Sequence, residues 1–569
     1  MNKDFIPTTP EEVHQRSWDA LDVILITGDS YIDSPFIGVA VIGRVLEKAG
    51  YHVGIIAQPD IQSEKEISRL GEPRLFWGVT GGSVDSMVAN TTANKKRRRS
   101  DDYTPGGINN RRPDRAVIAY SNLIRRYFKK TRPIVMGGIE SSLRRVAHYD
   151  FWDDAIRRSI LFDAKADYLL YGMAEQSVLA FAEALKNKND VHLVRGLSYI
   201  TREPPAHYLQ LPSYEEVAAD KLAFIRMFHT FYRNTDPITA KGLVQQHGDR
   251  FLVQNPPMHS PIQPELDEIY ALPYQRAQHP YYEAMGKVRA LETIKFSINS
   301  HRGCYGECNF CAIAVHEGRT VCWRSPASIV AEAEILTKYP DFKGYILDVG
   351  GPTANMYGFE CSKKLTSGAC EDQRCIYPEV CPALKPDHAN QIALLRALRK
   401  VPGVKKVFVG SGVRYDLVLA DHKHGKEYLE EITTQHVSGQ LKVAPEHTEK
   451  HVLEKMGKST KMELLQFKQL FDEFSRKAGK DQYLTYYFIA AHPVCTEADM
   501  RRLKTYASRE LHISPEQVQL FTPTPSTYSS LMYYTGLDPF TLKPLFVEKH
   551  PGRREHQKYL LTQKPDRPS

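Results

Sequence analysis

Short apolar runs alternate with amphipathic segments along most of the chain. Residues 21–28 (LDVILITG) form a continuous apolar run that is typical of a buried strand. A helical pattern over 36–50 ends at a glycine, and a second apolar run follows at 51–58. This order predicts strand–helix–strand units and a parallel sheet of about five strands between residues 15 and 200. We therefore predict a Rossmann-like, doubly wound domain over residues 1–203.

The pattern changes in the middle of the chain. Residues 242–257 indicate a hairpin, and the whole segment 204–289 predicts a helical and hairpin connecting region. Strand–helix alternation then restarts, with glycines at several strand ends, which predicts a partial α/β barrel over 290–560. The fold class is therefore predicted to be α/β, and residues 561–569 are expected to form a polar tail.

Composition narrows the class of protein. The chain has 569 residues, of which 42% are hydrophobic and 25% charged, so a disordered chain, a fibre and a single-core miniprotein are excluded. The net charge of +8 permits an anionic partner without requiring one. No apolar stretch approaches the length of a transmembrane helix, and the first residues lack the apolar core of a secretory signal. We therefore expect a cytoplasmic protein without membrane contact.

The nine cysteines are unevenly distributed. None occurs in the first 303 residues, and eight lie between Cys304 and Cys381. The cytosol keeps thiols reduced, and a disulfide framework would be spread through its domain. The clustering therefore predicts metal binding.

Three of these cysteines form the central motif. The string Cys304-Tyr-Gly-Glu-Cys308-Asn-Phe-Cys311 directly follows a predicted strand. Three thiolates at these spacings can hold an iron–sulfur cluster and leave one iron open. The alternative is a tetrahedral zinc site completed by His316 or His301, in a nucleic-acid-binding module. The position at the carboxyl end of a barrel strand favours iron, because such folds do their chemistry there.

A second cysteine group lies in an irregular insertion at 358–386. Its spacing could close a second metal site, with either zinc or an auxiliary iron–sulfur cluster. The alternative is a loop with reduced cysteines or two disulfides. The four candidate ligands are Cys361, Cys370, Cys375 and Cys381.

These motifs resemble those of a known superfamily. A CxxxCxxC loop with an aromatic residue before its last cysteine looks like the radical S-adenosylmethionine (SAM) superfamily. Within it, the YgiQ-type radical SAM proteins are similar to this chain in the strings SHRGCYGECNFCAIAVHEGR, DVGGPTANMYG, SGVRYD, KVAPEH, FTPTPSTYSSLMYYTG and MGGIESSLRRVAHYDFWDD. The likeness spans nearly the whole chain.

The resemblance implies a radical SAM enzyme. A [4Fe–4S] cluster would be held by Cys304, Cys308 and Cys311, with SAM chelating the open iron. A low-potential donor such as flavodoxin or ferredoxin would supply the electron that cleaves SAM to a 5′-deoxyadenosyl radical. The substrate could be RNA, protein or a small molecule, and the sequence identifies no further catalytic residue.

Strand order suggests residues that contact SAM. Gly350 and Gly351 end the second barrel strand, where free backbone could bind the SAM ammonium group. Many members of the superfamily have Gly-Gly-Glu there, whereas Pro352 can supply neither a carboxylate nor an N–H here. Ser411 and Arg414 follow the next strand and are candidates for holding the SAM carboxylate and ribose.

A doubly wound domain before a radical SAM barrel also resembles cobalamin-binding domains. Those with a histidine ligand to cobalt carry Asp-x-His-x-x-Gly after the first strand. Here Tyr31 stands in place of the histidine and Ser34 in place of the glycine. We therefore expect no cobalamin.

The basic run at 95–99, together with Arg111 and Arg112, could meet RNA phosphates. The alternative is an ordinary solvated loop. Two functions thus compete: a radical SAM enzyme that modifies an unknown substrate, and a zinc-binding, nucleic-acid-binding protein without radical chemistry.

Overall fold

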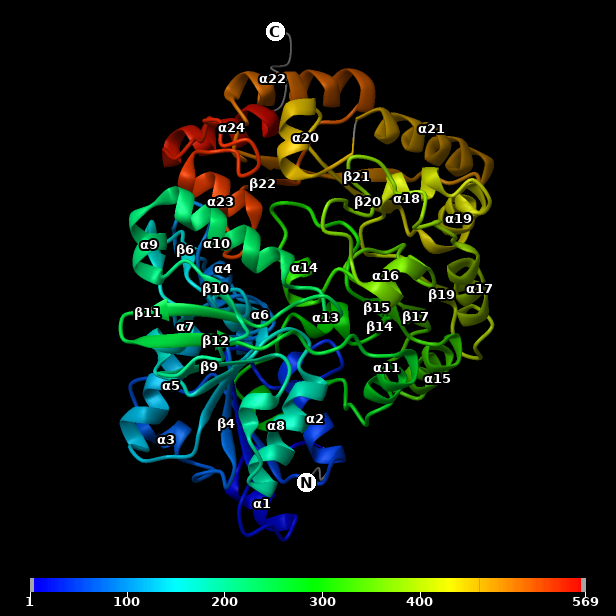
Figure 1. The fold of residues 1–569 in the computed structure, drawn as a ribbon. Helices are drawn as coiled ribbons and strands as arrows, with labels where there is room; N and C mark the ends of the chain where they lie inside the picture. The colour runs from blue at the N-terminus through cyan, green and yellow to red at the C-terminus, as the bar shows by residue number, and fades with distance from the viewer. Residues whose placement is uncertain (1–4, 460, 564–569) are drawn as a thin grey trace. The chain divides into compact units, whose positions relative to one another are not determined.

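The computed structural model describes residues 5–459 and 461–563. The chain divides into two compact units, and the ribbon in Figure 1 is coloured by residue number from the N-terminus to the C-terminus. One unit comprises Met1–Ser260 and Glu268–Lys295, and the other comprises Pro261–Asp267 and Phe296–Ser569.

The first unit is built on a parallel sheet. Its strands lie in the order β3-β1-β4-β5-β8, which is the 2-1-3-4-5 order of a doubly wound sheet. Every residue of β1 and β3 is buried, as their continuous apolar sequences predict. The five parallel strands are β1 (Val23–Thr27), β3 (Val53–Ala57), β4 (Phe76–Thr80), β5 (Ile134–Gly137) and β8 (Tyr168–Leu170).

Helices pack against this sheet through their apolar faces. The first of them, α2 (Gly38–Lys48), buries Val39, Val41 and Val45 and packs against α8 (Glu175–Asn187). Val39 of α2 and Phe181 of α8 join the strand residues in the apolar core of this unit, whereas Val41 and Val45 pack in a smaller cluster with Tyr274. The alternation of strands and helices predicted from the sequence is therefore present.

Four more strands extend the same sheet beyond β8. The hairpin predicted at 242–257 is present, and its second strand pairs antiparallel with β9. The segment 204–289 is therefore not a separate connecting region, because three of its strands complete the sheet of the first unit and bury residues such as Val244 and Val253 there. The added strands are β9 (Leu197–Thr201), β10 (Leu209–Leu211), β11 (Leu243–His247) and β12 (Arg250–Gln254).

The second unit repeats short parallel strands separated by helices. Strand β14 pairs with β18, β17 with β19, and β20, β21 and β22 form a three-stranded parallel sheet. A parallel bridge between Val413 and Val443 connects the earlier strands to β20. The strands are β14 (Ser297–Asn299), β17 (Tyr345–Ile346), β18 (Asp348–Gly350), β19 (Lys406–Val407), β20 (Gln440–Glu446), β21 (Tyr483–Ala490) and β22 (Val518–Leu520).

The helices of the second unit include two that the sequence pattern predicts. Helix α15 (Pro326–Leu336) begins where the Ser325 hydroxyl accepts a hydrogen bond from the Ser328 backbone N–H at 3.1 Å. Helix α17 (Ala389–Leu398) buries Leu394, Leu395 and Leu398. Both units are therefore of the predicted α/β class.

The end of the chain differs from the predicted tail. Helix α24 (Pro551–Thr562) continues past residue 560, and Leu561 is fully buried in the core of the second unit. Residues 564–569 of the predicted tail lie outside the described residues. Across the described part of the chain, no helix combines the length and apolarity that crossing a bilayer requires.

Candidate metal and cofactor site

The cysteine loop follows β14 and β15 (His301–Arg302) at the end of the first strand of the second unit. Its three thiols are half-buried. Gly303 has φ +84°, and a side chain there would lie 2.2 Å from the Thr320 carbonyl oxygen, so only glycine fits. The Gly306 backbone N–H donates to the Cys304 sulfur at 3.3 Å. The loop thus brings its own backbone against one candidate ligand.

The spacing of the sulfurs separates the two metal hypotheses. A zinc ion bound by three thiolates at about 2.3 Å holds their sulfurs within about 4 Å of one another. Among the described residues, two groups of three side chains bring their metal-binding atoms within 4.8 Å of one another. Neither group contains a cysteine. A four-iron cluster instead binds each thiolate at a different iron. The three loop sulfurs are therefore not gathered within the distance that a single zinc ion requires.

Arg414 reaches the cysteine loop from another strand end. It lies between β19 and β20, and its Nη1 donates to the Cys308 sulfur at 3.7 Å. A side-chain carbon placed on Gly306 would lie 3.2 Å from the Cys304 sulfur, 3.5 Å from the Cys308 sulfur and 3.7 Å from Arg414 Nη1. Two thiols and one guanidinium group therefore surround the same glycine.

A buried ion pair fixes this guanidinium group. Arg414 Nε donates to Asp416 at 2.9 Å, and its Nη2 forms a second contact with the same carboxylate. Burial alone would lower the pKa of Arg414, but the Asp416 carboxylate raises that pKa well above its usual range. Burial alone would raise the pKa of Asp416, but the positive charge of Arg414 outweighs burial and lowers the pKa of this carboxyl. A permanent positive charge therefore stands beside Cys308.

Two of the three loop thiols hold their protons more tightly than a free cysteine does. Burial raises the pKa of Cys304 and Cys311, and the neighbouring Cys308 raises both further. Thiolates that bind iron must therefore lose protons as the metal enters.

The predicted SAM contacts lie at neighbouring strand ends but are already engaged. The Ser411 hydroxyl donates to Asp348, whose carboxylate also accepts the Gly410 backbone N–H at 2.8 Å. Gly350 ends β18, and a side chain there would lie 3.3 Å from the Ser411 hydroxyl oxygen. At Gly351 the nearest atom would be the His301 carbonyl oxygen at 2.6 Å. These two glycines therefore serve close packing of strand ends.

Three further residues at this site were not singled out from the sequence. The Thr353 hydroxyl lies 3.9 Å from the Cys304 sulfur, and Asp416 holds Arg414. Lys458 lies 3.9 Å from Glu446, whose pKa is raised by burial in spite of that lysine and Arg414. Thr353 lies in the string DVGGPTANMYG and Asp416 in SGVRYD, but the role of each depends on a contact that no spacing rule reveals.

The second cysteine group has a different environment. Cys361 and Cys375 lie in the same apolar cluster as Cys304. The Lys364 ammonium group donates to the Cys375 sulfur at 3.6 Å, and burial raises the pKa of this thiol to about 11. Since neither compact group of metal-binding side chains among the described residues contains a cysteine, a second metal site stays a prediction without geometric support.

The carboxyl edge of the first unit's sheet is filled by its own chain. Arg112 is fully buried between Asp29 at 2.8 Å and Asp101 at 3.1 Å, and it donates to the Gly81 carbonyl oxygen at 2.8 Å. Tyr31 is also fully buried, and its hydroxyl accepts the Ile6 backbone N–H at 3.1 Å. Neither Asp29 nor Tyr31 is therefore available as a ligand to a cobalt ion.

The basic run is largely engaged in internal contacts. Lys95 donates to the Trp152 carbonyl oxygen at 3.1 Å, Arg97 pairs with Asp114 at 2.6 Å, and Arg98 donates to two backbone carbonyls. Arg97 is thereby paired with a carboxylate, while all five residues of the run stay exposed.

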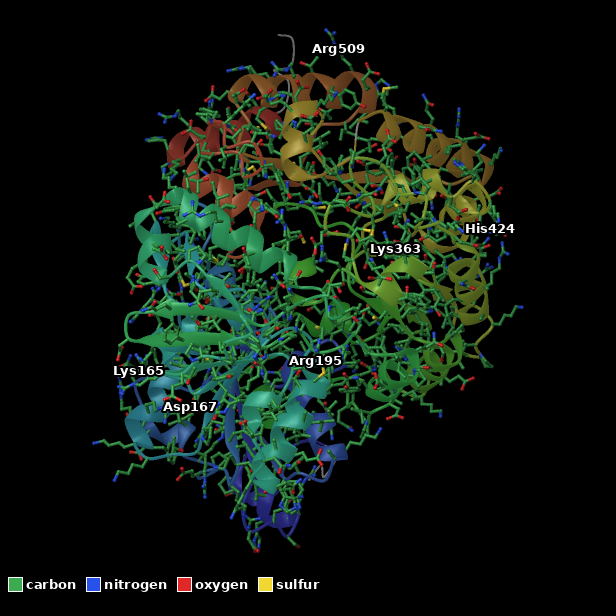
Figure 2. All side chains as sticks on the ribbon, in the orientation of Figure 1. Lys165, Asp167, Arg195, Lys363, His424 and Arg509 are labelled. Atoms are coloured by element: carbon green, nitrogen blue, oxygen red, sulfur yellow. The ribbon has the colours of Figure 1, made fainter. Side chains whose placement is uncertain are left out.

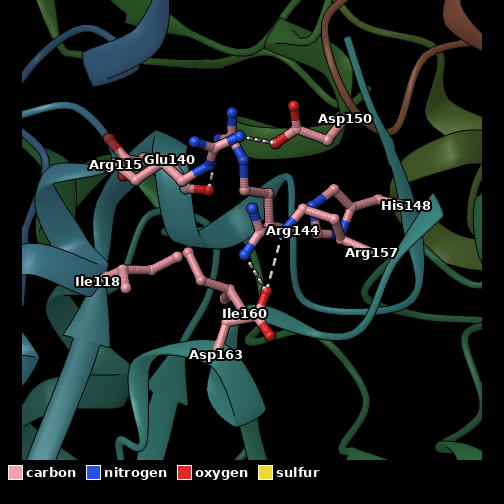
Figure 3. A pocket seen from close by; sticks show the side chains of 9 residues that line it. All are labelled: Arg115, Ile118, Glu140, Arg144, His148, Asp150, Arg157, Ile160 and Asp163. Atoms are coloured by element: carbon pink, nitrogen blue, oxygen red, sulfur yellow. Dashed lines mark hydrogen bonds and ion pairs between the residues drawn. The ribbon is translucent and has the colours of Figure 1, made fainter. Parts of the chain in front are cut away.

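A small pocket in the first unit is lined by arginine and carboxylate side chains in equal number. Figure 3 shows guanidinium and carboxylate groups facing one another around it, with Arg115 paired to Asp150 at 3.1 Å and Arg157 to Asp163 at 2.8 Å. Burial lowers the pKa of His148 in this pocket to about 4. Because the charges compensate, the pocket has no evident surplus with which to attract an anion.

Comparison with solved structures supports the fold. The radical SAM methyltransferase TsrM from Kitasatospora setae, solved with cobalamin and a [4Fe–4S] cluster bound, matches with a TM-score of 0.50 and 16% identity. The match covers 90% of this chain and 74% of that protein. The expectation that cobalamin is unlikely is wrong in the light of this match, because the fold is shared with a cobalamin-bound enzyme. The substitution at Tyr31 bears on one mode of cobalt ligation and not on the fold.

Comparison with protein sequences identifies the family. The Radical SAM N-terminal family model matches residues 5–297. A UPF0313 protein of Fusobacterium nucleatum is 57% identical, over 98% of this chain and 99% of its own. A UPF0313 protein of Methanocella arvoryzae is 50% identical, over 98% of this chain and 92% of its own. The resemblance to YgiQ-type radical SAM proteins is thereby confirmed, and the chain belongs to the UPF0313 family of radical SAM enzymes.

Proposed function

We propose that this enzyme binds a [4Fe–4S] cluster at Cys304, Cys308 and Cys311 and SAM at the open iron. The observation that carries the proposal is the convergence of two thiols and the Arg414 guanidinium group around Gly306. The cluster and SAM together supply one-electron cleavage of SAM, which yields methionine and a 5′-deoxyadenosyl radical that abstracts hydrogen from a substrate. The core around the site would be a partial α/β barrel.

The residues of this chain bind, orient and exclude water. Arg414 is the best candidate for the SAM carboxylate, because Asp416 leaves its Nη1 directed at Cys308. Thr353 can supply a hydroxyl group near Cys304. Ser411 already donates its proton to Asp348, so it can offer SAM only an acceptor. Gly350 and Gly351 would keep the adjacent backbone close to the bound ligand.

The partners follow from the chemistry. A low-potential donor such as flavodoxin or ferredoxin would deliver the electron. RNA, protein and small-molecule substrates all stay open, because the exposed basic run permits RNA without requiring it.

The first experiment measures iron, acid-labile sulfide and zinc after anaerobic purification, in the intact protein and in Cys304→Ala. About four irons with matching sulfide, lost in the variant, would support the proposal. Cys322→Ala is the matched control, since Cys322 is half-buried and outside the motif. About eight irons would mean that the second cysteine group also holds a cluster. Stoichiometric zinc in place of iron, lost in Cys304→Ala, would overturn the cluster assignment.

Cobalamin is a candidate for the first unit, and the shared fold with the cobalamin-bound methyltransferase supports it. Because Asp29 and Tyr31 are engaged in internal contacts, neither side chain would bind the cobalt of a corrin held by this unit. The test is the cobalt content and absorption spectrum after incubation with hydroxocobalamin and removal of the excess. About one cobalt per chain supports binding, and none in protein that retains its iron contradicts it.

A further inference from the structure

The insertion at 358–386 packs directly on the cysteine loop. The Tyr305 hydroxyl, one residue after Cys304, donates to the Phe359 carbonyl oxygen. The Glu360 carboxylate accepts the Val321 backbone N–H at 2.8 Å. This first set of contacts ties the beginning of the insertion to the beginning of the loop.

A buried lysine strengthens this first set of contacts. Lys364 lies on α16 (Ser362–Ser367), with only 4% of its side chain exposed, and pairs with Glu360 at 3.0 Å. Its ammonium group also donates to the Arg319 carbonyl oxygen at 2.7 Å and lies 4.9 Å from the centre of the Tyr305 ring. The charge of Glu360 overrides the burial of Lys364 and raises the pKa of its ammonium group. The pair joins the insertion to both ends of the segment that contains the cysteines.

A second set of contacts comes from one arginine. Arg374 Nη1 donates to the Glu307 carbonyl oxygen at 2.9 Å, and its Nη2 donates to the Asn309 side-chain oxygen at 2.7 Å. These two acceptors are the residues immediately before and after Cys308. One guanidinium group thus brackets a candidate cluster ligand.

The backbone that Arg374 holds is strained. Glu307 has φ +43°, in the left-handed region that non-glycine residues seldom occupy. Such a conformation persists only when its surroundings enforce it. The neighbouring Gly457 has φ +66°, and a side chain there would lie 2.5 Å from Arg374 Nη1, so the approach of the guanidinium group depends on that glycine.

We propose that the insertion is a clamp that holds the cysteine loop in its cluster-binding conformation, with Arg374 as the positioning residue. This inference rests on the proposed function, since it concerns the loop that would hold the cluster. It gives the insertion a role that requires no second metal. The clamp acts through contacts with Tyr305, Glu307 and Asn309, and Cys361 and Cys375 of the insertion pack in the apolar cluster that contains Tyr305.

The test compares cluster retention in reconstituted wild type, Arg374→Ala and Arg374→Lys. The measurement is the rate at which iron passes to a coloured chelator under anaerobic conditions, together with the electron paramagnetic resonance spectrum of the reduced cluster. We expect release about tenfold to a hundredfold faster in Arg374→Ala, because two charge-assisted hydrogen bonds are lost. The lysine variant should be intermediate, since one ammonium group cannot reproduce the planar fork.

Lys363→Ala provides the matched control. Lys363 lies on α16 of the same insertion, is labelled in Figure 2 and is exposed. It should release iron at the wild-type rate. If Arg374→Ala does not fold, as judged by circular dichroism, Arg374→Lys decides the question in its place.

The outcomes separate this proposal from the function on which it rests. Wild type that binds no iron would overturn the proposed function and the clamp with it. Wild type that binds about four irons, with both Arg374 variants releasing them at the wild-type rate and with an unchanged spectrum, would overturn the clamp alone. Release as fast in Lys363→Ala as in Arg374→Ala would also overturn it, because the effect would then belong to any change in the insertion.

Discussion

Replacing Asp416 with asparagine removes the carboxylate that compensates a buried guanidinium group. Arg414 is only 9% exposed, and Asp416 receives two of its N–H groups as well as the Leu417 backbone N–H at 2.9 Å. Asparagine keeps the shape but leaves the positive charge of Arg414 without its partner. Breaking a buried ion pair in this way costs about 3–5 kcal/mol. At roughly 2 °C per kcal/mol for a domain of this size, the thermal midpoint of the second unit should fall by about 6–10 °C.

Two assays on two variants and the wild type separate stability from binding. Differential scanning calorimetry should show the loss in Asp416→Asn and a partial recovery in the double variant Arg414→Met/Asp416→Asn, because removal of both charges relieves the uncompensated burial. The double variant, once reconstituted, should bind SAM more weakly than the wild type at equilibrium, because it lacks the Arg414 guanidinium group. A midpoint for Asp416→Asn within 1 °C of wild type would refute the ion-pair argument. SAM binding at wild-type affinity in the double variant would refute the assignment of Arg414.

Two other predictions concern packing and pH. Gly351→Ala should abolish SAM binding and lower the thermal midpoint, because its new carbon would lie 2.6 Å from the His301 backbone oxygen. Gly350→Ala, whose closest contact is 3.3 Å, should lower the free energy of unfolding by about 1 kcal/mol or less. Equal thermal midpoints for the two variants would contradict this prediction. Stability should also fall as pH drops below about 6.5, since burial holds the pKa of five imidazoles at about 3 to 4 and the unfolded chain then binds more protons than the folded one. The limiting slope is about 7 kcal/mol per pH unit, and a thermal midpoint that does not change between pH 7 and pH 5 would exclude this account. The five histidines are His148, His247, His301, His447 and His492.

Local pattern predicted the strands of the first unit but not the full extent of its sheet. The buried strands β1 and β3 follow from continuous apolar runs, and the β11–β12 hairpin from two short runs around a turn. Whether that hairpin forms a connecting region or joins an existing sheet depends on which strand edge is free. The free edge is that of β9, and the pairing of β9 with β12 links residues about fifty positions apart in the sequence. Periodicity within a window carries no information at that separation.

The candidate site shows the same division between local and distant information. Sequence spacing identified Cys304, Cys308 and Cys311, because their chemistry depends on their separation in one loop. Arg414 could be proposed from its place after a strand. Its partner Asp416 and the bracketing Arg374 could not, because a charge reveals its role only when burial removes the solvent that would otherwise satisfy it.

Packing in one apolar cluster explains part of the clustering of the cysteines along the sequence. Cys361 and Cys375 share an apolar cluster with Cys304, and that cluster includes the fully buried Tyr305 and Met356. Cysteine is a small apolar side chain when it is neither ionised nor bound to metal. A shell of such residues limits the access of water to the cysteine loop, and the polarity around a metal centre governs its redox potential. Three of the cysteines between residues 304 and 381 therefore line the proposed cluster site, and Cys361 and Cys375 of the insertion help to limit the access of water to it.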